Sequence, residues 1–155
     1  MPIVAFALLL IQPPGVPAVV TVTPAQSVSL AAGSKAEARL TVTVKKGYHV
    51  QANPASEPYL IPLQLEMESD ARLRALKPVY PPGKPYRLEG TESDLSTYDG
   101  TFEIRLPLEA PAGAAAGEVT LSGTLRYQAC DDHICLRPAS ISVSLPVKLV
   151  EGAKR

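Results

Sequence analysis

Hydrophobic and polar residues alternate along much of the chain after residue 19. In AEARLTVTV, residues 36–44, the apolar side chains of Ala38, Leu40, Val42 and Val44 alternate with charged residues and threonines. Successive side chains of a β-strand point to opposite faces of the sheet. A period of two therefore predicts a strand with one buried face and one face in water.

The same alternation returns three more times. The further predicted strands are TFEIRLPLE at 101–109, EVTLSGTLRY at 118–127 and ISVSLPVKLV at 141–150. Turn-forming residues lie between the predicted strands, at Lys46-Gly47, Pro82-Gly83, Asp99-Gly100 and in the small-residue segment 110–118. No stretch has a convincing helical period. Strands of this number and spacing predict an all-β fold, an immunoglobulin-like antiparallel two-sheet sandwich.

Composition agrees with an all-β chain and narrows the possible functions. The 155 residues fit one domain of the usual ~100 to 200 residues, and no internal repeat or second domain is found. The 16 prolines are about twice the usual share of ~5% and argue against long helices. The 15 lysines and arginines balance 15 aspartates and glutamates, so we expect no basic face for nucleic acid.

The first eighteen residues are predicted to form a signal segment. An apolar run from Ile3 to Ile11 is too short to span ~30 Å of hydrocarbon but suits the core of a secretory signal. The residues Val16-Pro17-Ala18 form a tolerable cleavage site, although only the terminal amine is positively charged. We expect residues 19–155 to be one exported domain without a transmembrane segment. The alternative for the apolar run is an N-terminal strand.

The two cysteines of the chain lie close together, between two long predicted strands. They are Cys130 and Cys135 in YQACDDHICLRP, residues 127–138. If the strands pair as a hairpin, the cysteines flank its tip and reach the ~5.5 Å Cα separation of a disulfide. Export agrees with a disulfide, because cytosolic proteins rarely keep one. The spacing alone leaves three interpretations: a structural disulfide, a redox pair or a metal site.

The neighbouring residues bear on the chemistry of this pair. A disulfide closing about six residues contributes only ~2 kcal/mol on the chain-entropy model, so it is a poor structural cross-link. At a polar hairpin tip, a partner thiolate would reach a sulfur atom. Asp131 and Asp132 are expected to raise the pKa of a nearby thiol, whereas a protonated His133 would lower it. A thiol that stays mostly protonated is a slow nucleophile, which suits a pair that reacts mainly with a matched partner.

Three segments resemble a known family. LRYQACDDHICLRP at 125–138, GYHVQANPAS at 47–56 and STYDGTFEIRLPLE at 96–109 are similar to the amino-terminal periplasmic domain of the thiol:disulfide interchange protein DsbD. The resemblance extends over residues 22–150. It implies an immunoglobulin-like sandwich in which Cys130 and Cys135 are the exchanging pair. The domain would then be a component of a protein-disulfide reductase, and we expect no cofactor.

The resemblance also assigns residues around the pair. Family members shield the disulfide with a cap loop that carries an aromatic residue. The matching residue is Tyr98, with Asp99 and Gly100 setting the turn. The best-known family form has a second aromatic where this chain has Asp99, so we expect looser closure of the cap. Tyr48 and Tyr127 are candidates for the floor of the site.

Partners follow from the same resemblance. The family architecture continues into a multi-spanning membrane domain and a thioredoxin-like domain, neither of which lies in these 155 residues. We therefore expect a separate thioredoxin-fold protein as electron donor and oxidised periplasmic thiol proteins as acceptors. We favour Cys135 as the attacked sulfur, because it lies closer in sequence to Arg137 whereas Cys130 lies closer to the paired acids.

Two other interpretations stay open. In the first, Cys130, His133 and Cys135 bind copper or zinc, with His49 or Asp132 as a fourth ligand. In the second, the chain is a non-catalytic secreted sandwich that binds a partner through its loops, and the disulfide only fixes a turn.

Overall fold

The computed structural model describes residues 18–24 and 26–153. The predicted signal segment therefore lies outside the described residues, apart from Ala18. The described residues form twelve strands and no helix. It follows that they contain no helix long and apolar enough to cross a membrane.

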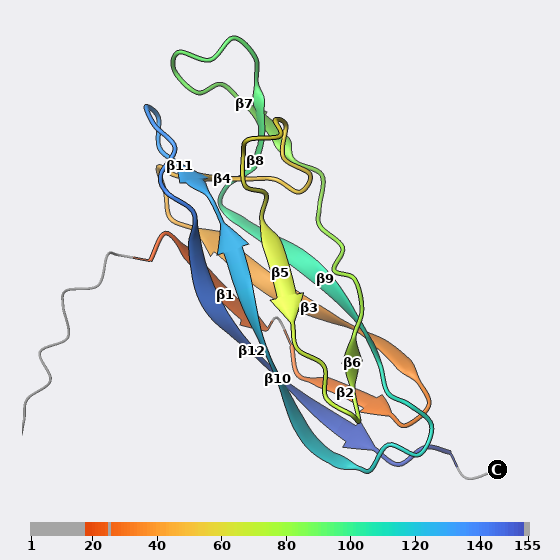
Figure 1. Ribbon diagram of the computed structural model, residues 1–155. Helices are drawn as coiled ribbons and strands as arrows, with labels where there is room; N and C mark the ends of the chain where they lie inside the picture. Colours follow the sequence, from red (N-terminus) through yellow and green to blue (C-terminus); the bar gives the residue numbers. More distant parts are fainter. Residues whose placement is uncertain (1–17, 25, 154–155) are drawn as a thin grey trace, which may run out of the picture.

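Two four-stranded sheets form the body of the domain (Figure 1). In the first sheet the strand order is β1 (Val20–Pro24), β3 (Lys35–Val44), β9 (Thr101–Glu109) and β6 (Arg74–Ala75). In the second it is β2 (Val28–Ala31), β12 (Ala139–Val150), β10 (Gly117–Tyr127) and β5 (Gln64–Met67). The predicted all-β, immunoglobulin-like sandwich is confirmed.

One strand pair departs from the antiparallel prediction. Strand β2 runs parallel to β12, with Val28 opposite Val147 and Leu30 opposite Leu149. The chain passes from β1 in one sheet to β2 in the other without reversing its direction (Figure 1). The other strand pairs among the described residues are antiparallel.

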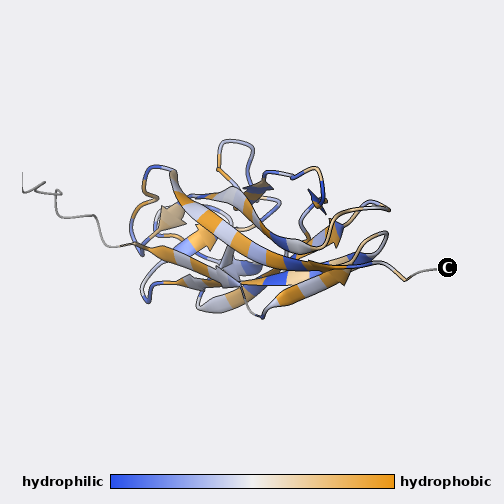
Figure 2. Cartoon of the chain, turned by 90° about the horizontal axis from the view of Figure 1, so that it is seen from below, coloured by the Kyte–Doolittle hydropathy of each residue, from blue (hydrophilic) through white to orange (hydrophobic). Residues whose placement is uncertain are grey.

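The alternating residues of the four long strands form the core between the two sheets. The alternation is visible as bands of colour along the strands (Figure 2). The buried residues are Ala38, Leu40, Val42 and Val44 of β3; Ile104, Leu106 and Leu108 of β9; Val119, Leu121 and Leu125 of β10; and Val143, Leu145, Val147 and Leu149 of β12. Burying each leucine or isoleucine stabilises the fold by roughly 1.5–3 kcal/mol. All of these positions lie on the faces that the sequence period assigned to the core, whereas Phe102 and Ile141 on the same faces are only partly buried.

A third, small sheet caps one end of the sandwich, away from the end where β12 finishes (Figure 1). Its strand order is β11 (Ala129–Cys130), β4 (His49–Gln51), β8 (Leu95–Tyr98) and β7 (Lys84–Tyr86). Val50, Tyr98 and Ala129 form one row across the sheet and belong to the main core. The opposite face of the small sheet, which we call the outer face, carries His49, Gln51, Cys130 and Thr97.

The connections place the cysteines in the small sheet. Strands β10 and β12 pair from Gly117 opposite Leu149 to Tyr127 opposite Ala139, which confirms the predicted hairpin. Residues 128–138 connect them and fold back onto β4, where the backbone N–H of Gln51 donates to the carbonyl of Gln128 at 3.0 Å. Cys130 is therefore a strand residue rather than part of a free hairpin tip.

Gly83 shows a structural role that its sequence context did not predict. The pair Pro82-Gly83 is expected to form a turn, but Gly83 instead packs closely against Ser96 of β8 and against Ala52, which follows β4. A Cβ at this position would lie 2.0 Å from Ser96 Oγ and 2.7 Å from Ala52 Cβ. Glycine is needed here for close packing, which holds the start of β7 against β8.

Candidate functional site

Cys130 and Cys135 form a disulfide at the edge of the small sheet. The S–S distance is 2.03 Å and the Cα atoms are 3.9 Å apart. The two residues lie opposite each other as an antiparallel bridge at the neck of a tight turn. Two backbone hydrogen bonds flank them, from Asp131 N–H to Ile134 at 2.9 Å and from Leu136 N–H to Ala129 at 2.7 Å. The hairpin geometry thus brings the sulfurs within bonding distance, as the sequence predicts.

The two sulfur-bearing residues differ in their exposure. Cys130 is 0% exposed, whereas Cys135 is partly buried. The prediction of an exposed, polar tip is therefore wrong for Cys130, because the connection folds back onto β4 instead of extending into water. Cys135 packs against a small apolar cluster of Leu60, Leu88 and Leu95, which is separate from the main core.

A buried glutamine touches both sulfur atoms. Gln51 Nε2 lies 3.2 Å from Cys130 Sγ and 3.9 Å from Cys135 Sγ, and it donates to them. The side chain of Gln51 is 0% exposed and lies opposite Thr97, which is also buried. Gln51 is not among the residues that the sequence predicts for the site. The available signal was the alternation in GYHVQANPAS, which places Gln51 on the same strand face as His49.

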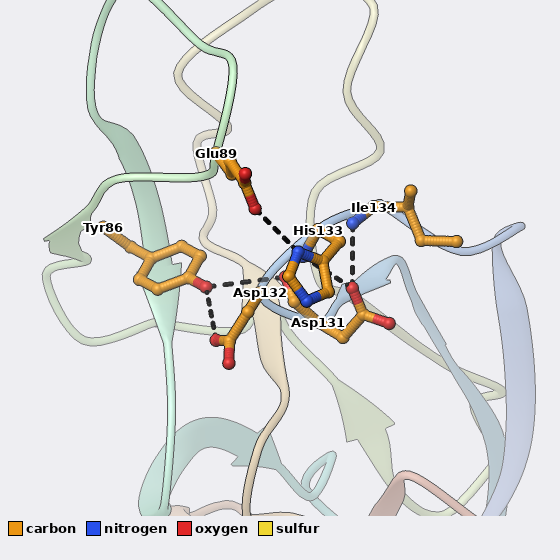
Figure 3. Close-up of polar contacts among 6 residues, drawn as sticks. All are labelled: Tyr86, Glu89, Asp131, Asp132, His133 and Ile134. Atoms are coloured by element: carbon orange, nitrogen blue, oxygen red, sulfur yellow. Dashed lines mark hydrogen bonds and ion pairs between the residues drawn. The ribbon is translucent and has the colours of Figure 1, made fainter.

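Polar contacts connect the turn between the cysteines to residues 86–94, which we call the covering segment (Figure 3). The hydroxyl of Tyr86 donates to Asp132 Oδ1 at 3.1 Å, and His133 Nδ1 lies 2.7 Å from Glu89 Oε2. The ring of Tyr86 also stacks on His49, with ring centroids 3.7 Å apart. The predicted residues Asp132 and His133 therefore bind the covering segment.

Asp131 shapes the turn itself. Its Oδ1 accepts the backbone N–H groups of His133 and Ile134, each at 2.8 Å (Figure 3). These hydrogen bonds, first from Ile134 and then from His133, lower the pKa of the Asp131 carboxyl below its ordinary value. Asp131 thus organises the loop between the two cysteines.

We expect the hydrogen bonds of Asp131 to break in acid. Because the folded-state pKa is lowered, their stabilising contribution is present above the ordinary aspartate value of about 3.9 and is lost as pH falls through the folded-state value. In an NMR titration, the chemical shifts of the amide protons of His133 and Ile134 should change together, with a midpoint at a pH below about 3.9. The amide of Leu136, which donates to Ala129, serves as the control. A midpoint at or above the ordinary value would contradict the assignment.

The predicted shielding residue Tyr98 lies in the main core. It is 3% exposed, and its ring packs on Phe102 with centroids 4.5 Å apart. The Tyr98 hydroxyl donates to the carbonyl of Pro81 at 2.8 Å and accepts the backbone N–H of Asn53 at 3.0 Å. Burial raises the pKa of this hydroxyl.

The register of the small sheet explains why Tyr98 does not meet the disulfide. Tyr98 pairs with Val50 and shares its core-facing row, whereas Cys130 pairs with His49 on the outer face. Gly100 follows β8 at a bend with φ of 60°, as a turn residue should. Asp99 lies between Lys84 Nζ at 3.4 Å and His49 Nε2 at 3.9 Å. The side chains that form the apolar cluster at Cys135 are instead Leu60, Leu88 and Leu95, with Tyr86 packed against them.

The two tyrosines expected at the floor of the site also pack on the main core. Tyr127 is buried, and burial raises its pKa. Tyr48 is partly buried against the same core. Neither belongs to the apolar cluster around Cys135.

The arrangement does not assemble the alternative metal site. Across residues 18–24 and 26–153, no three His, Cys, Asp or Glu side chains are close enough to hold a metal ion. The two sulfur atoms are bonded to each other, and His133 faces Glu89. His49 is instead stacked on Tyr86.

Comparisons with known proteins agree with this description. The family model described as thiol:disulfide interchange protein DsbD, N-terminal, matches residues 17–146. The N-terminal periplasmic domain of ScsB from Proteus mirabilis superposes with a TM-score of 0.56 and 14% identity, over 81% of this chain and 44% of that chain. This likeness shows the fold, and the chain spans less than half of that protein's solved chain.

Other comparisons add little. A PapD-like domain of human CEP192 aligns over 98% of this chain and 100% of that chain, but with 11% identity and a TM-score of only 0.39. No curated protein sequence matches the chain. The family match, in contrast, extends over most of the sequence and includes both cysteines. The chain therefore belongs to the family of N-terminal domains of the thiol:disulfide interchange protein DsbD.

Proposed function

We propose that this domain performs thiol-disulfide exchange through Cys130 and Cys135 in the periplasm. The observation that carries the proposal is the position of the disulfide. It joins neighbouring residues at the edge of the small sheet, and only one of its two residues is partly exposed. Membership of the DsbD N-terminal family and the periplasmic origin of the ScsB domain support both the activity and the location.

The difference in exposure supports Cys135 as the attacked sulfur. A thiolate of a thioredoxin-fold donor attacks Cys135 Sγ, a mixed disulfide forms, and the electron pair of the broken bond leaves on Cys130 Sγ. The second thiol of the donor then attacks the mixed disulfide and releases Cys135 as a thiolate. The donor leaves as a disulfide, and the two cysteines take up two protons, one from the donor's second thiol and one from water. The reduced pair can then reduce oxidised periplasmic thiol proteins by the reverse steps.

Attack on Cys135 requires the covering segment to move. Leu88 of this segment and Leu60 pack around Cys135, so they must separate before a partner can approach. The contact between His133 and Glu89 opposes such opening only weakly, since both side chains are highly exposed and exposed pairs contribute little. The covering segment thus takes the role that the resemblance assigns to the loop at Tyr98.

The reduction potential of the pair tests the proposal. After equilibration with glutathione or thioredoxin, thiol alkylation and mass measurement, we expect a potential between roughly −270 and −180 mV, the range of thioredoxin and protein disulfide isomerase. The burial of Cys130 favours one competing function, a non-catalytic domain with a structural disulfide. A potential well below about −300 mV would support that competitor and contradict exchange.

A further inference from the structure

The strongest unexplained feature of the domain is the amide of Gln51. Among the described residues, Gln51 and Thr97 are the buried polar residues, and Gln51 is completely enclosed. Burying an amide costs free energy unless its polar atoms are hydrogen-bonded. The Nε2 group of Gln51 is directed at the disulfide, with Cys130 Sγ at 3.2 Å. A neutral disulfide sulfur is only a weak acceptor, so this contact compensates poorly for the burial.

The other end of the amide is not satisfied either. Within the part of the chain that the structure describes, Gln51 Oε1 has no hydrogen-bond partner. Buried polar side-chain atoms normally have at least one partner, and exceptions call for an explanation. A purely structural glutamine would bond at both ends. Gln51 instead keeps a donor against the sulfur of Cys130, which becomes a strong acceptor only when it carries negative charge.

We propose that Gln51 is a catalytic residue that donates a hydrogen bond to the Cys130 thiolate as this sulfur leaves. The proposal rests on the proposed exchange function and adds a residue to it. When the donor's thiolate bonds to Cys135 Sγ, the Cys130–Cys135 bond breaks and its electron pair stays on Cys130 Sγ. Gln51 Nε2–H is already in place beside that atom and needs no rearrangement.

The surroundings of Cys130 explain why such a donor is needed. Cys130 is fully enclosed, and burial in a protein disfavours a thiolate. The titratable residues around Cys130 include His49, opposite on β4, and Asp131 and Asp132, which follow it in sequence. Asp131 and Asp132 add negative charge to the loop, and His49 Nδ1 is buried without a partner among the described residues. Gln51 is thus the donor in direct contact with the leaving sulfur.

The test compares Gln51→Met with its parent in two measurements. The first is the thiolate pKa of Cys130, followed by ultraviolet absorbance in the Cys135→Ser background. Replacing the donor by a side chain of similar length should raise this pKa by about one unit, equivalent to about 1.4 kcal/mol. His49, Asp131 and Asp132 are unchanged between the two proteins, so the difference reports on the amide.

The second measurement is the rate of reduction of the intact disulfide by dithiothreitol and by reduced thioredoxin. A poorer leaving group leaves more slowly, so we expect Gln51→Met to reduce both rate constants roughly three- to tenfold. Gln64→Met is the matched control, because Gln64 is exposed on β5 and its side-chain amide donates to Glu66 rather than to a sulfur atom. It should change neither the pKa nor the rates.

A second substitution covers the case in which Gln51→Met does not fold. Gln51→Glu keeps the size of the side chain but puts a carboxylate beside the sulfur, so the Cys130 pKa should rise further. If the wild type is reactive and a folded Gln51→Met or Gln51→Glu protein has the same Cys130 pKa and the same reduction rates, the proposed role of Gln51 is wrong. That result leaves the exchange function standing. A wild-type disulfide that is inert to both reductants overturns the exchange function, and the catalytic role of Gln51 with it.

Discussion

Serine at either position 130 or position 135 is expected to abolish dithiol-disulfide exchange completely while the sandwich stays folded. Exchange needs both sulfurs, one to be attacked and one to leave. The fold does not need the disulfide, because β10 and β12 already pair along their whole length. Loss of the disulfide should cost only about 2 kcal/mol on the chain-entropy model. Urea unfolding checks this, with the reduced wild-type protein as control because it lacks the same cross-link.

The two serine variants are expected to differ from each other in reactivity. Cys130→Ser leaves the partly exposed Cys135, whereas Cys135→Ser leaves Cys130, which is 0% exposed. An aromatic disulfide reagent should therefore react at least about tenfold faster with Cys130→Ser, since exchange depends on access. The mixed disulfide that this reagent forms with Cys135 should then trap a thioredoxin whose second active-site cysteine has been removed, because the thioredoxin thiolate attacks Cys135 Sγ and releases the aromatic thiol. Trapping mainly through Cys130 would contradict the assignment of Cys135, and unfolding of both variants would favour a structural disulfide.

Tyr98→Ala is expected to destabilise the domain by about 3–5 kcal/mol, the usual cost of deleting a buried aromatic ring. The substitution removes a 3% exposed side chain from the core beside Phe102. It also leaves the backbone N–H of Asn53 and the carbonyl of Pro81 without their partner. Urea or thermal unfolding measures the effect.

The matched control for this prediction is Tyr59→Ala. Tyr59 is 75% exposed, so its removal should change stability by no more than about 0.5 kcal/mol. If Tyr98 instead were a mobile shield, Tyr98→Ala would leave stability unchanged and accelerate reduction of the disulfide. That pair of results would restore the role that the family resemblance assigns to Tyr98.

The long strands could be predicted because each is half buried. In β3 and β9 one face meets the core and the other meets water. The alternation of apolar and polar residues therefore predicts that Leu40 and Ile104 are buried. The small sheet could not be predicted in the same way. Its strands have two to four residues, which is too short to establish a period.

The cysteine pair was evident from sequence, but its surroundings were not. Hairpin pairing of β10 and β12 brings Cys130 and Cys135 together by a local rule. The burial of Cys130 and its contact with Gln51 depend on residues 128–138 folding back onto β4, which joins segments 79 residues apart. The family resemblance placed the cap loop at Tyr98. In the structure Tyr98 is the last residue of β8, and its pairing with Val50 puts its ring on the core-facing side of the small sheet.

The two faces of the small sheet have different neighbours. One face belongs to the sandwich core, and the other carries Cys130. Along β4, Val50 points into the sandwich core, while His49 and Gln51 on either side of it face the disulfide. Alternate residues of this three-residue strand thus have different surroundings: Val50 lies in the core, and its two neighbours lie on the face that carries Cys130. Substitutions on the outer face are therefore expected to change the surroundings of the disulfide without removing a side chain from the sandwich core.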